Sequence, residues 1–490
     1  MRILSFREII LIITGFLILS SMVFSFTDPK KNPLGIGSDS YEFWHLSTNI
    51  LEHKTFSYTD LTYYPLFFLG DNPPPELVNQ SVPCTTRVPG YSLLLALARG
   101  VWNSPNIAIG LNMLSYMGIC LYGFLLGRML FPVDKQRLIY NIFLTLSPLY
   151  FIRWGVGADY VASFYVTGFA FHLLKIIQTD SKSIRHIFGA ALFGLLAVLT
   201  RPNLLVFTTG LTILLIMTAL LKKHDRYLSR LFIVLLIMML GTNSWMERNK
   251  NLTGQRILST QNGSVLYTVH LSPHIDETRP LYKWSKQQRR ELFIEHLRTG
   301  KTFNQSEAII NDQTKSVSMN FLKENPALLL TNTINGLRTF FLFSYYDISD
   351  ILIYALRPMA DRLHYLETEH YQSINPFENL LRQCLFQISR VYKICLAFGF
   401  LAFPLLIVFK KVRSGLPDLT MIMSLYLTTM LSVLSTAFFT GAGGDRLRMP
   451  FNAFILMFAV FFWCHLFPLK SKKIPHFIRN LFFAGRNFQQ

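Results

Sequence analysis

The sequence predicts an all-α polytopic integral membrane protein with about ten transmembrane helices and two long outer loops. Three observations support this fold class. Of the 490 residues, 51% are hydrophobic and only 15% are charged, whereas a soluble chain carries about a quarter charged residues. The apolar residues are gathered into long uncharged blocks, as in membrane spans. The loops between these blocks differ sharply in charge, which distinguishes the two sides of a membrane.

Ten uncharged runs bounded by charged residues are candidate spans. They cover residues 9–26, 104–127, 138–152, 160–174, 186–200, 202–221, 231–246, 394–409, 419–444 and 449–469. Five have only 15 or 16 residues, fewer than the roughly 20 that cross a bilayer, but flanking lysine and arginine side chains can reach the membrane surface and lengthen a span. Residues 327–346 are apolar but contain Asn332, Asn335 and Arg338, so we expect this segment to lie on the membrane or dip into it.

Charge predicts which side of the membrane each loop occupies. Ten spans place both termini on one side, and the termini and short loops of that side hold 20 Lys and Arg residues against 5 Asp and Glu. The opposite side holds 27 against 23. By the positive-inside rule both termini are cytoplasmic, which in a bacterial inner membrane places the long loops and the active site in the periplasm. The same rule explains the net charge of +19 without any nucleic-acid partner.

The predicted spans divide the chain into six parts. These are a first transmembrane helix at 1–26, an outer loop at 27–103, helices 2–7 at 104–246, a second outer loop with amphipathic helices at 247–393, helices 8–10 at 394–469 and a basic cytoplasmic tail at 470–490. The first helix lacks a clear signal-peptide cleavage site, so we expect it to remain as an anchor. Cys84 and Cys384 both fall on the outer side, where they can pair or remain free thiols.

Unusual polar residues gather at the outer ends of the spans and in the outer loops. Each has a structural explanation when taken alone: Asp39 with Glu42 reads as a capping box, Asp159 as a helix cap, and the arginines as membrane-interface anchors. Together they suggest chemistry at the outer surface, because arginine binds phosphate through paired, charge-assisted hydrogen bonds and a nearby carboxylate can deprotonate an attacking hydroxyl. The candidate site residues are Asp39, Arg87, Tyr91, Asp159, Arg201, Arg248, Arg446 and Arg448.

The order of these motifs resembles the GT-C superfamily of polyprenyl-phosphate-sugar glycosyltransferases, in particular its protein O-mannosyltransferase-like and aminoarabinose-transferase-like branches. The segments that carry the resemblance run from about residue 35 to 460. They are "SDSYEFWHLSTNIL", "TRVPGYSLLLAL", "GADYVASFYVTGFAF", "GLLAVLTRPNLL", "NSWMERNKNLTGQRILSTQNGSVLY" and "GDRLRMPFNAFILMFA".

The resemblance implies a GT-C fold and a role for each residue. Asp39 would be the catalytic base, and the segment from Arg87 to Tyr91 would lie near the donor phosphate. Asp159 would orient the acceptor or contact a divalent metal, and no cofactor is otherwise implied. Arg248, Arg446 and Arg448 would bind the phosphate or support the structure, and Arg201 is added as a phosphate ligand. The expected partners are a polyprenyl-phosphate sugar such as an undecaprenyl-phosphate sugar, membrane lipids, and a glycan, lipid or protein acceptor.

The sequence departs from the superfamily at two places. Asp39 is flanked by Ser38 and Ser40 where many relatives have an adjacent acidic pair, and Leu447 stands where many have a tyrosine between two arginines. The sugar and the acceptor therefore stay open, from lipopolysaccharide to protein glycosylation. Two alternatives also remain: a transporter or flippase of lipid-linked sugars, and a non-catalytic member of a glycan-assembly complex. The nearly uncharged span interiors argue against transport.

Overall fold

A computed structural model describes residues 4–26, 38–59, 81–151, 156–178, 184–222, 225–261, 265–267, 286–342, 376–409, 418–440 and 448–467. Within them the chain is almost entirely helical. The helices are α1 (Phe6–Phe26), α2 (Ser38–Glu52), α3 (Gly90–Val101), α4 (Asn106–Leu130), α5 (Asp134–Thr145), α6 (Asp159–Gln178), α7 (Ile184–Thr200), α8 (Leu204–Leu221), α9 (Asp225–Thr253), α11 (Lys286–Arg298), α12 (Phe303–Glu324), α13 (Pro326–Leu342), α16 (Pro376–Val408), α18 (Leu419–Thr440) and α20 (Asn452–Leu466), with short 3-10 helices η3 (Pro148–Phe151) and η7 (Met449–Phe451).

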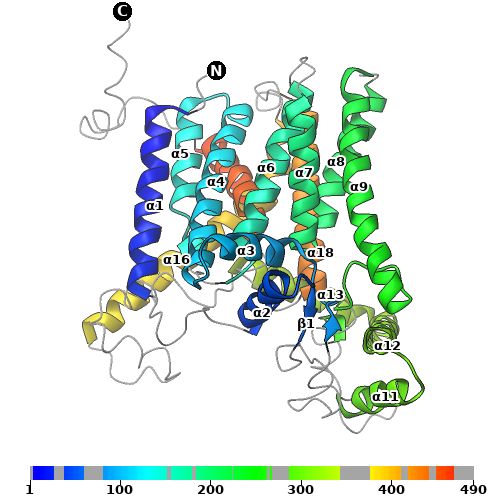
Figure 1. The fold of residues 1–490 in the computed structure, drawn as a ribbon. Coiled ribbons are helices and arrows are strands. Elements are labelled where there is room, and N and C mark those ends of the chain that lie inside the picture. The colour runs from blue at the N-terminus through cyan, green and yellow to red at the C-terminus, as the bar shows by residue number, and fades with distance from the viewer. Residues whose placement is uncertain are drawn as a thin grey trace, which may run out of the picture.

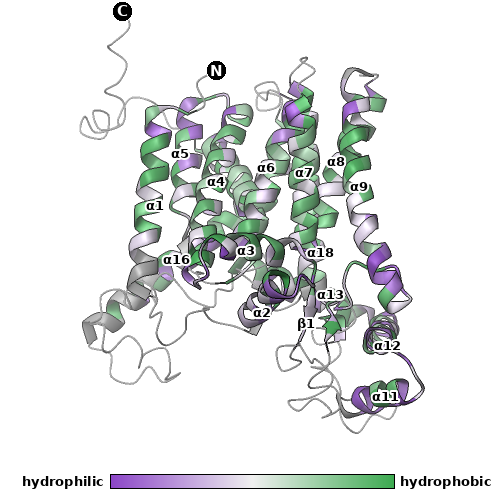
Figure 2. Ribbon diagram, in the orientation of Figure 1, coloured by the Kyte–Doolittle hydropathy of each residue, from purple (hydrophilic) through white to green (hydrophobic). Residues whose placement is uncertain are grey.

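The long helices form a bundle with a group of shorter helices at one end. In Figure 1, α1, α4, α5, α6, α7 and α9 run side by side, whereas α2, α3, α11 and α12 lie at the lower end of the view. Hydrophobic residues cover the bundle, and hydrophilic ones concentrate in α11, α12 and at the helix ends (Figure 2). Among the described residues, seven helices are long and apolar enough to cross a membrane: α4, α6, α8, α9, α16, α18 and the helix that η7 and α20 form together, Met449–Leu466. The predicted all-α, multi-pass membrane fold is therefore confirmed.

Two predicted spans are shorter in the structure than a membrane is thick. Residues 138–152 were expected to be one span, but α5 has 12 residues and is followed by η3, which begins at Pro148. Proline lacks an N–H and disfavours helical backbone in the preceding residue, which accounts for the break. The span expected at 186–200 is α7, an apolar helix of 17 residues. The first predicted span is α1, which has 21 residues and is about 31 Å long at 1.5 Å per residue.

The two amphipathic helices predicted in the second outer loop correspond to α11 and α12. Helix α12 begins at Phe303 because Thr302 caps it. The hydroxyl of Thr302 accepts from the Gln305 N–H, and the Gln305 side chain accepts from the Thr302 N–H, which is a complete capping box. Helix α13 then starts at Pro326 and packs on α18, where Gly336 leaves room for the carbonyl of Ala437.

A short β-hairpin completes the group of elements at this end. Strands β1 (Ser57–Tyr58) and β2 (Val82–Pro83) are antiparallel, with Ser57 opposite Pro83 and Tyr58 opposite Val82. The hairpin packs on α2, and β2 leads directly into the segment before α3 that contains Arg87. The hairpin therefore brings the end of α2 and the Arg87 segment together.

Candidate active site

Arg87 is the centre of a three-residue charge cluster at this end of the bundle. Its Nη2 lies 2.6 Å from Asp39 Oδ1 and 2.6 Å from Glu42 Oε2, and its Nε donates to Glu42 Oε2 at 2.8 Å. Asp39 and Glu42 stand one turn apart near the start of α2, so both carboxylates face the same guanidinium. The Asp39 side chain is 24% exposed and the Glu42 side chain 3%, so Asp39 is the carboxylate that solvent and ligands can reach.

Glu42 is buried by a network that sequence reasoning missed. Its Oε1 accepts a hydrogen bond from the Tyr58 hydroxyl, whose oxygen lies 2.9 Å from Thr86 Oγ1 and 3.4 Å from Cys84 Sγ. Tyr58 and Arg87 thus bind both oxygens of Glu42, and α2 begins at Ser38, so Asp39 lies inside the first turn and not at the N-cap position that the predicted capping box requires. Tyr58 is fully buried in β1, and nothing in its local sequence marks it as a partner of Glu42.

The segment that carries Arg87 is held through its backbone carbonyls, each of which accepts a hydrogen bond from the second outer loop or the helix before it. Pro83 O accepts from Asn304 Nδ2 at 2.9 Å, Cys84 O from Arg248 Nη1 at 2.7 Å, Thr85 O from Thr260 N at 3.1 Å, and Thr86 O from Ser259 Oγ at 2.5 Å. The Thr85 hydroxyl also donates to Glu307, 3.0 Å away. The position of Arg87 therefore depends on residues about 160 to 220 positions later in the chain.

Arg248 contributes to this support rather than pointing at Asp39. Besides Cys84 O, its Nη2 donates to Phe56 O at 3.4 Å, and the guanidinium carbon lies 4.5 Å from the centroid of the Trp245 ring. It therefore holds both strands of the hairpin through their backbone. A sequence pattern shows only a cation at the end of a span and cannot show that carbonyls are its partners.

A second ion pair joins Asp159, the first residue of α6, to Arg201, which lies between α7 and α8. Asp159 is 3% and Arg201 11% exposed, so both are largely removed from water. Two hydrogen bonds connect the residues just before Asp159 to the Arg87 cluster. Ser40 Oγ donates to Val156 O at 2.7 Å, and the Gly157 N–H donates to the Tyr91 hydroxyl at 2.9 Å.

Gly90 gives a third connection between the two ion pairs. A Cβ at this position would lie 2.5 Å from Leu199 O and 2.9 Å from Thr200 N, at the end of α7 immediately before Arg201. The Arg-x-Pro-Gly-Tyr segment thus uses Arg87 to bind α2, Gly90 to pack on α7 and Tyr91 to reach the start of α6. Tyr91 itself is fully buried. The structure brings five of the predicted residues together: Asp39, Arg87, Tyr91, Asp159 and Arg201.

The remaining predicted arginines, Arg446 and Arg448, come late in the sequence. Arg448 precedes η7, is 3% exposed and donates from Nη1 to Phe341 O at 2.8 Å. Phe341 is in the last turn of α13, whose carbonyls lack partners within the helix, so Arg448 caps that helix. Arg446 lies outside the described residues.

Burial and charge set the protonation of two groups in the cluster. Burial alone lowers the pKa of Arg87, but the carboxylates of Glu42 and Asp39 raise it above its usual value, so the guanidinium is charged. Burial and the Glu42 carboxylate raise the pKa of the Cys84 thiol to about 11. Cys84 is a buried free thiol and Cys384 an exposed one, so the two are not paired in the structure.

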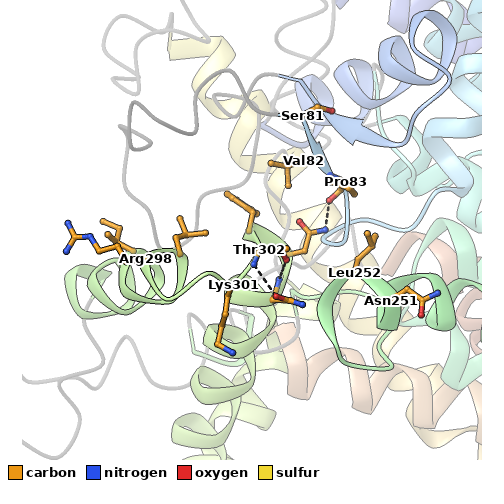
Figure 3. A pocket seen from close by; sticks show the side chains of 13 residues that line it. Ser81, Val82, Pro83, Asn251, Leu252, Arg298, Lys301 and Thr302 are labelled. Atoms are coloured by element: carbon orange, nitrogen blue, oxygen red, sulfur yellow. Dashed lines mark hydrogen bonds between the residues drawn. The ribbon is translucent and has the colours of Figure 1, made fainter.

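The described residues contain no group of three His, Cys, Asp or Glu side chains arranged to hold a metal ion. Asp39 and Asp159 each face an arginine instead. A cavity nearby is lined by residues of β2, the end of α9, α11 and the start of α12, and includes none of the predicted site residues (Figure 3).

The chain is similar in fold to two kinds of solved membrane protein. An archaeal oligosaccharyltransferase, AglB from Archaeoglobus fulgidus in complex with an inhibitory peptide and a dolichol-phosphate, matches with a TM-score of 0.47 and 11% identity over 96% of this chain and 53% of that chain. Its apo form matches with a TM-score of 0.46 and 11% identity over 95% and 51%. This chain thus spans about half the length of those proteins.

ArnT from Cupriavidus metallidurans bound to undecaprenyl phosphate matches with a TM-score of 0.36 and 9% identity over 91% of this chain and 78% of that chain. No family model and no curated protein matches the sequence.

Proposed function

We propose that this protein is a membrane glycosyltransferase that moves a sugar from a polyprenyl-phosphate donor to a hydroxyl of a glycan, lipid or protein acceptor on the outer face of the membrane. One observation carries the proposal: an accessible carboxylate, Asp39, lies 2.6 Å from a guanidinium that is fixed on its other side by the buried Glu42. A base and a phosphate ligand in contact are the minimum equipment for this transfer.

The step follows from the roles of these two groups. The acceptor oxygen attacks the anomeric carbon, its proton passes to Asp39, and the bond from the anomeric carbon to the phosphate oxygen breaks with inversion. Arg87 stabilises the negative charge that the leaving phosphate gains. Phosphate leaves without needing a proton, so the mechanism requires no general acid.

The other predicted residues take different roles in this proposal. Asp159 and Arg201 form the second half of the site and orient the acceptor or the phosphate. Tyr91 and Arg248 position the Arg87 segment, because Tyr91 is fully buried and Arg248 contacts backbone carbonyls. Arg448 supports α13, and Arg446 stays a predicted phosphate ligand.

The test measures release of undecaprenyl phosphate when the purified protein is incubated with undecaprenyl-phosphate sugars. Asp39→Asn is expected to lower the rate by about 10²–10⁴-fold, the usual contribution of a general base. Asp312→Asn, which changes an exposed carboxylate on α12, is the matched control and should retain the wild-type rate. Retention of near-wild-type transfer by folded Asp39→Asn would show that Asp39 is not the base. Binding of the lipid without release would favour the flippase or the non-catalytic alternative.

A further inference from the structure

The cavity behind the Arg87 segment contains none of the residues that the proposed reaction uses, and its volume is in the range of protein ligand sites. Its volume is about 790 Å³. Protein sites for small molecules occupy about 300–1,000 Å³, enough for a di- or trisaccharide. The cavity lies between the hairpin and helices α11 and α12, at the end of the molecule away from the bundle of long helices (Figures 1 and 3).

The charge of the cavity is one-sided. None of its lining residues is an aspartate or glutamate, whereas Arg298 and Lys301 stand at its rim and extend outwards (Figure 3). Both are exposed, and neither forms an ion pair with a carboxylate that the structure describes. An anionic ligand that arrives from the outer solution therefore meets two exposed cations first.

The walls further inside combine apolar surface with amide groups. Val82, Leu252 and Phe303 supply apolar contacts, the amide oxygen of Asn304 supplies a hydrogen-bond acceptor, and the exposed Asn251 supplies a further amide at the edge. This mixture suits a sugar ring, which presents apolar C–H faces and hydroxyls at its edge. A simple inorganic anion needs no such apolar wall.

A hydrogen bond also connects the lining of the cavity to the segment that carries Arg87. Asn304 lines it and donates a hydrogen bond to Pro83 O, and Pro83 lies four residues before Arg87. Four residues span no more than about 14 Å, so the wall of the cavity at Pro83 lies within that distance of Arg87 along the chain.

We infer that this cavity binds the acceptor, and that the acceptor is an acidic saccharide whose carboxylate groups contact Arg298 and Lys301. That the saccharide is the acceptor depends on the proposed function, whereas the binding of an acidic saccharide to the cavity does not.

The experiment measures binding to the full chain in lipid nanodiscs by calorimetry. The probes are trigalacturonate, the neutral maltotriose and inorganic phosphate. Trigalacturonate should bind more tightly than either of the other two, and its binding should weaken as salt is raised. Each exposed cation contributes about three- to fivefold in affinity, so Arg298→Ala with Lys301→Ala should weaken trigalacturonate binding about tenfold. Lys315→Ala, an exposed lysine of α12 outside the cavity, should leave it unchanged.

Several results would overturn the inference: no binding of trigalacturonate, equal affinity for maltotriose, or the same affinity in the double variant as in the wild type. Tightest binding of inorganic phosphate would reduce the site to an anion site. Release of undecaprenyl phosphate is measured in the same samples. If release occurs without trigalacturonate binding, the cavity inference fails and the proposed function stands. If trigalacturonate binds without any release, the cavity is a saccharide site in a protein with another function.

Discussion

Replacing Arg87 alone should destabilise the protein more than replacing Arg87 and Glu42 together. Glu42 is 3% exposed and Arg87 16%, so Arg87→Met leaves a carboxylate buried with only Tyr58 as a partner. Removing one member of a buried pair costs about 3–5 kcal/mol, chiefly because the remaining charge is uncompensated. Asp39 adds little to this cost, because at 24% exposure water can solvate it.

The double variant Glu42→Gln with Arg87→Met removes that charge. A neutral glutamine can still accept the hydrogen bond from Tyr58, so the remaining loss is about 1 kcal/mol per missing hydrogen bond. Two hydrogen bonds from Arg87 are lost, so the double variant should be about 1–3 kcal/mol more stable than Arg87→Met, on the difference between these two costs.

The assay is the apparent melting temperature in lipid, followed by tryptophan fluorescence at one fixed heating rate. The expected order is wild type above the double variant, and the double variant above Arg87→Met. Neither variant should transfer sugar, because both lack the proposed phosphate ligand. If the double variant melts at or below the single one, Glu42 is not a buried charge that depends on Arg87, and the account of the cluster is wrong.

Two further predictions concern packing and thiol chemistry. Gly90→Ala should reduce the free energy of unfolding by about 1–3 kcal/mol and so lower the melting temperature, because the new methyl would lie 2.5 Å from Leu199 O. The control is Gly110→Ala, which has open space within 4 Å and should leave the melting temperature unchanged. Cys384 should react with a water-soluble maleimide at pH 8 in the native protein, and Cys84 should not. The Cys84 thiol is buried, and because its pKa is about 11 it stays protonated at pH 8. Peptide mass spectrometry checks this, and labelling of Cys84 at the rate of Cys384 would contradict it.

The sequence predicted the elements of the cluster better than their pairing. Asp39, Arg87, Asp159 and Arg201 were expected on one face because each stands at the outer end of a predicted span or in an outer loop. The pairing of Arg87 with α2 depends on the hairpin and on hydrogen bonds to residues of the second outer loop. Such contacts between distant segments leave no periodic or spacing signal in the chain.

The same limit explains the residues whose roles were missed. Glu42 was assigned to a helix cap because a carboxylate three residues after Asp39 fits the capping pattern. In the structure the Tyr58 hydroxyl and the Arg87 guanidinium compete successfully for it, and both come from segments beyond α2. Arg248 was expected as a phosphate ligand, and only the fold shows that backbone carbonyls surround it.

Arg87 forms more contacts with Glu42 than with Asp39, and this difference suggests how donor binding and the basicity of Asp39 are coupled. Glu42 is buried and contacts both Nε and Nη2, whereas Asp39 is more exposed and is paired with Nη2. An incoming phosphate that competes for Nη2 would therefore displace Asp39 before Glu42. A carboxylate that loses a neighbouring positive charge becomes a stronger base. In this scheme Asp39 gains basicity only when the donor is in place, and Glu42 with Tyr58 keeps Arg87 aimed at the phosphate throughout.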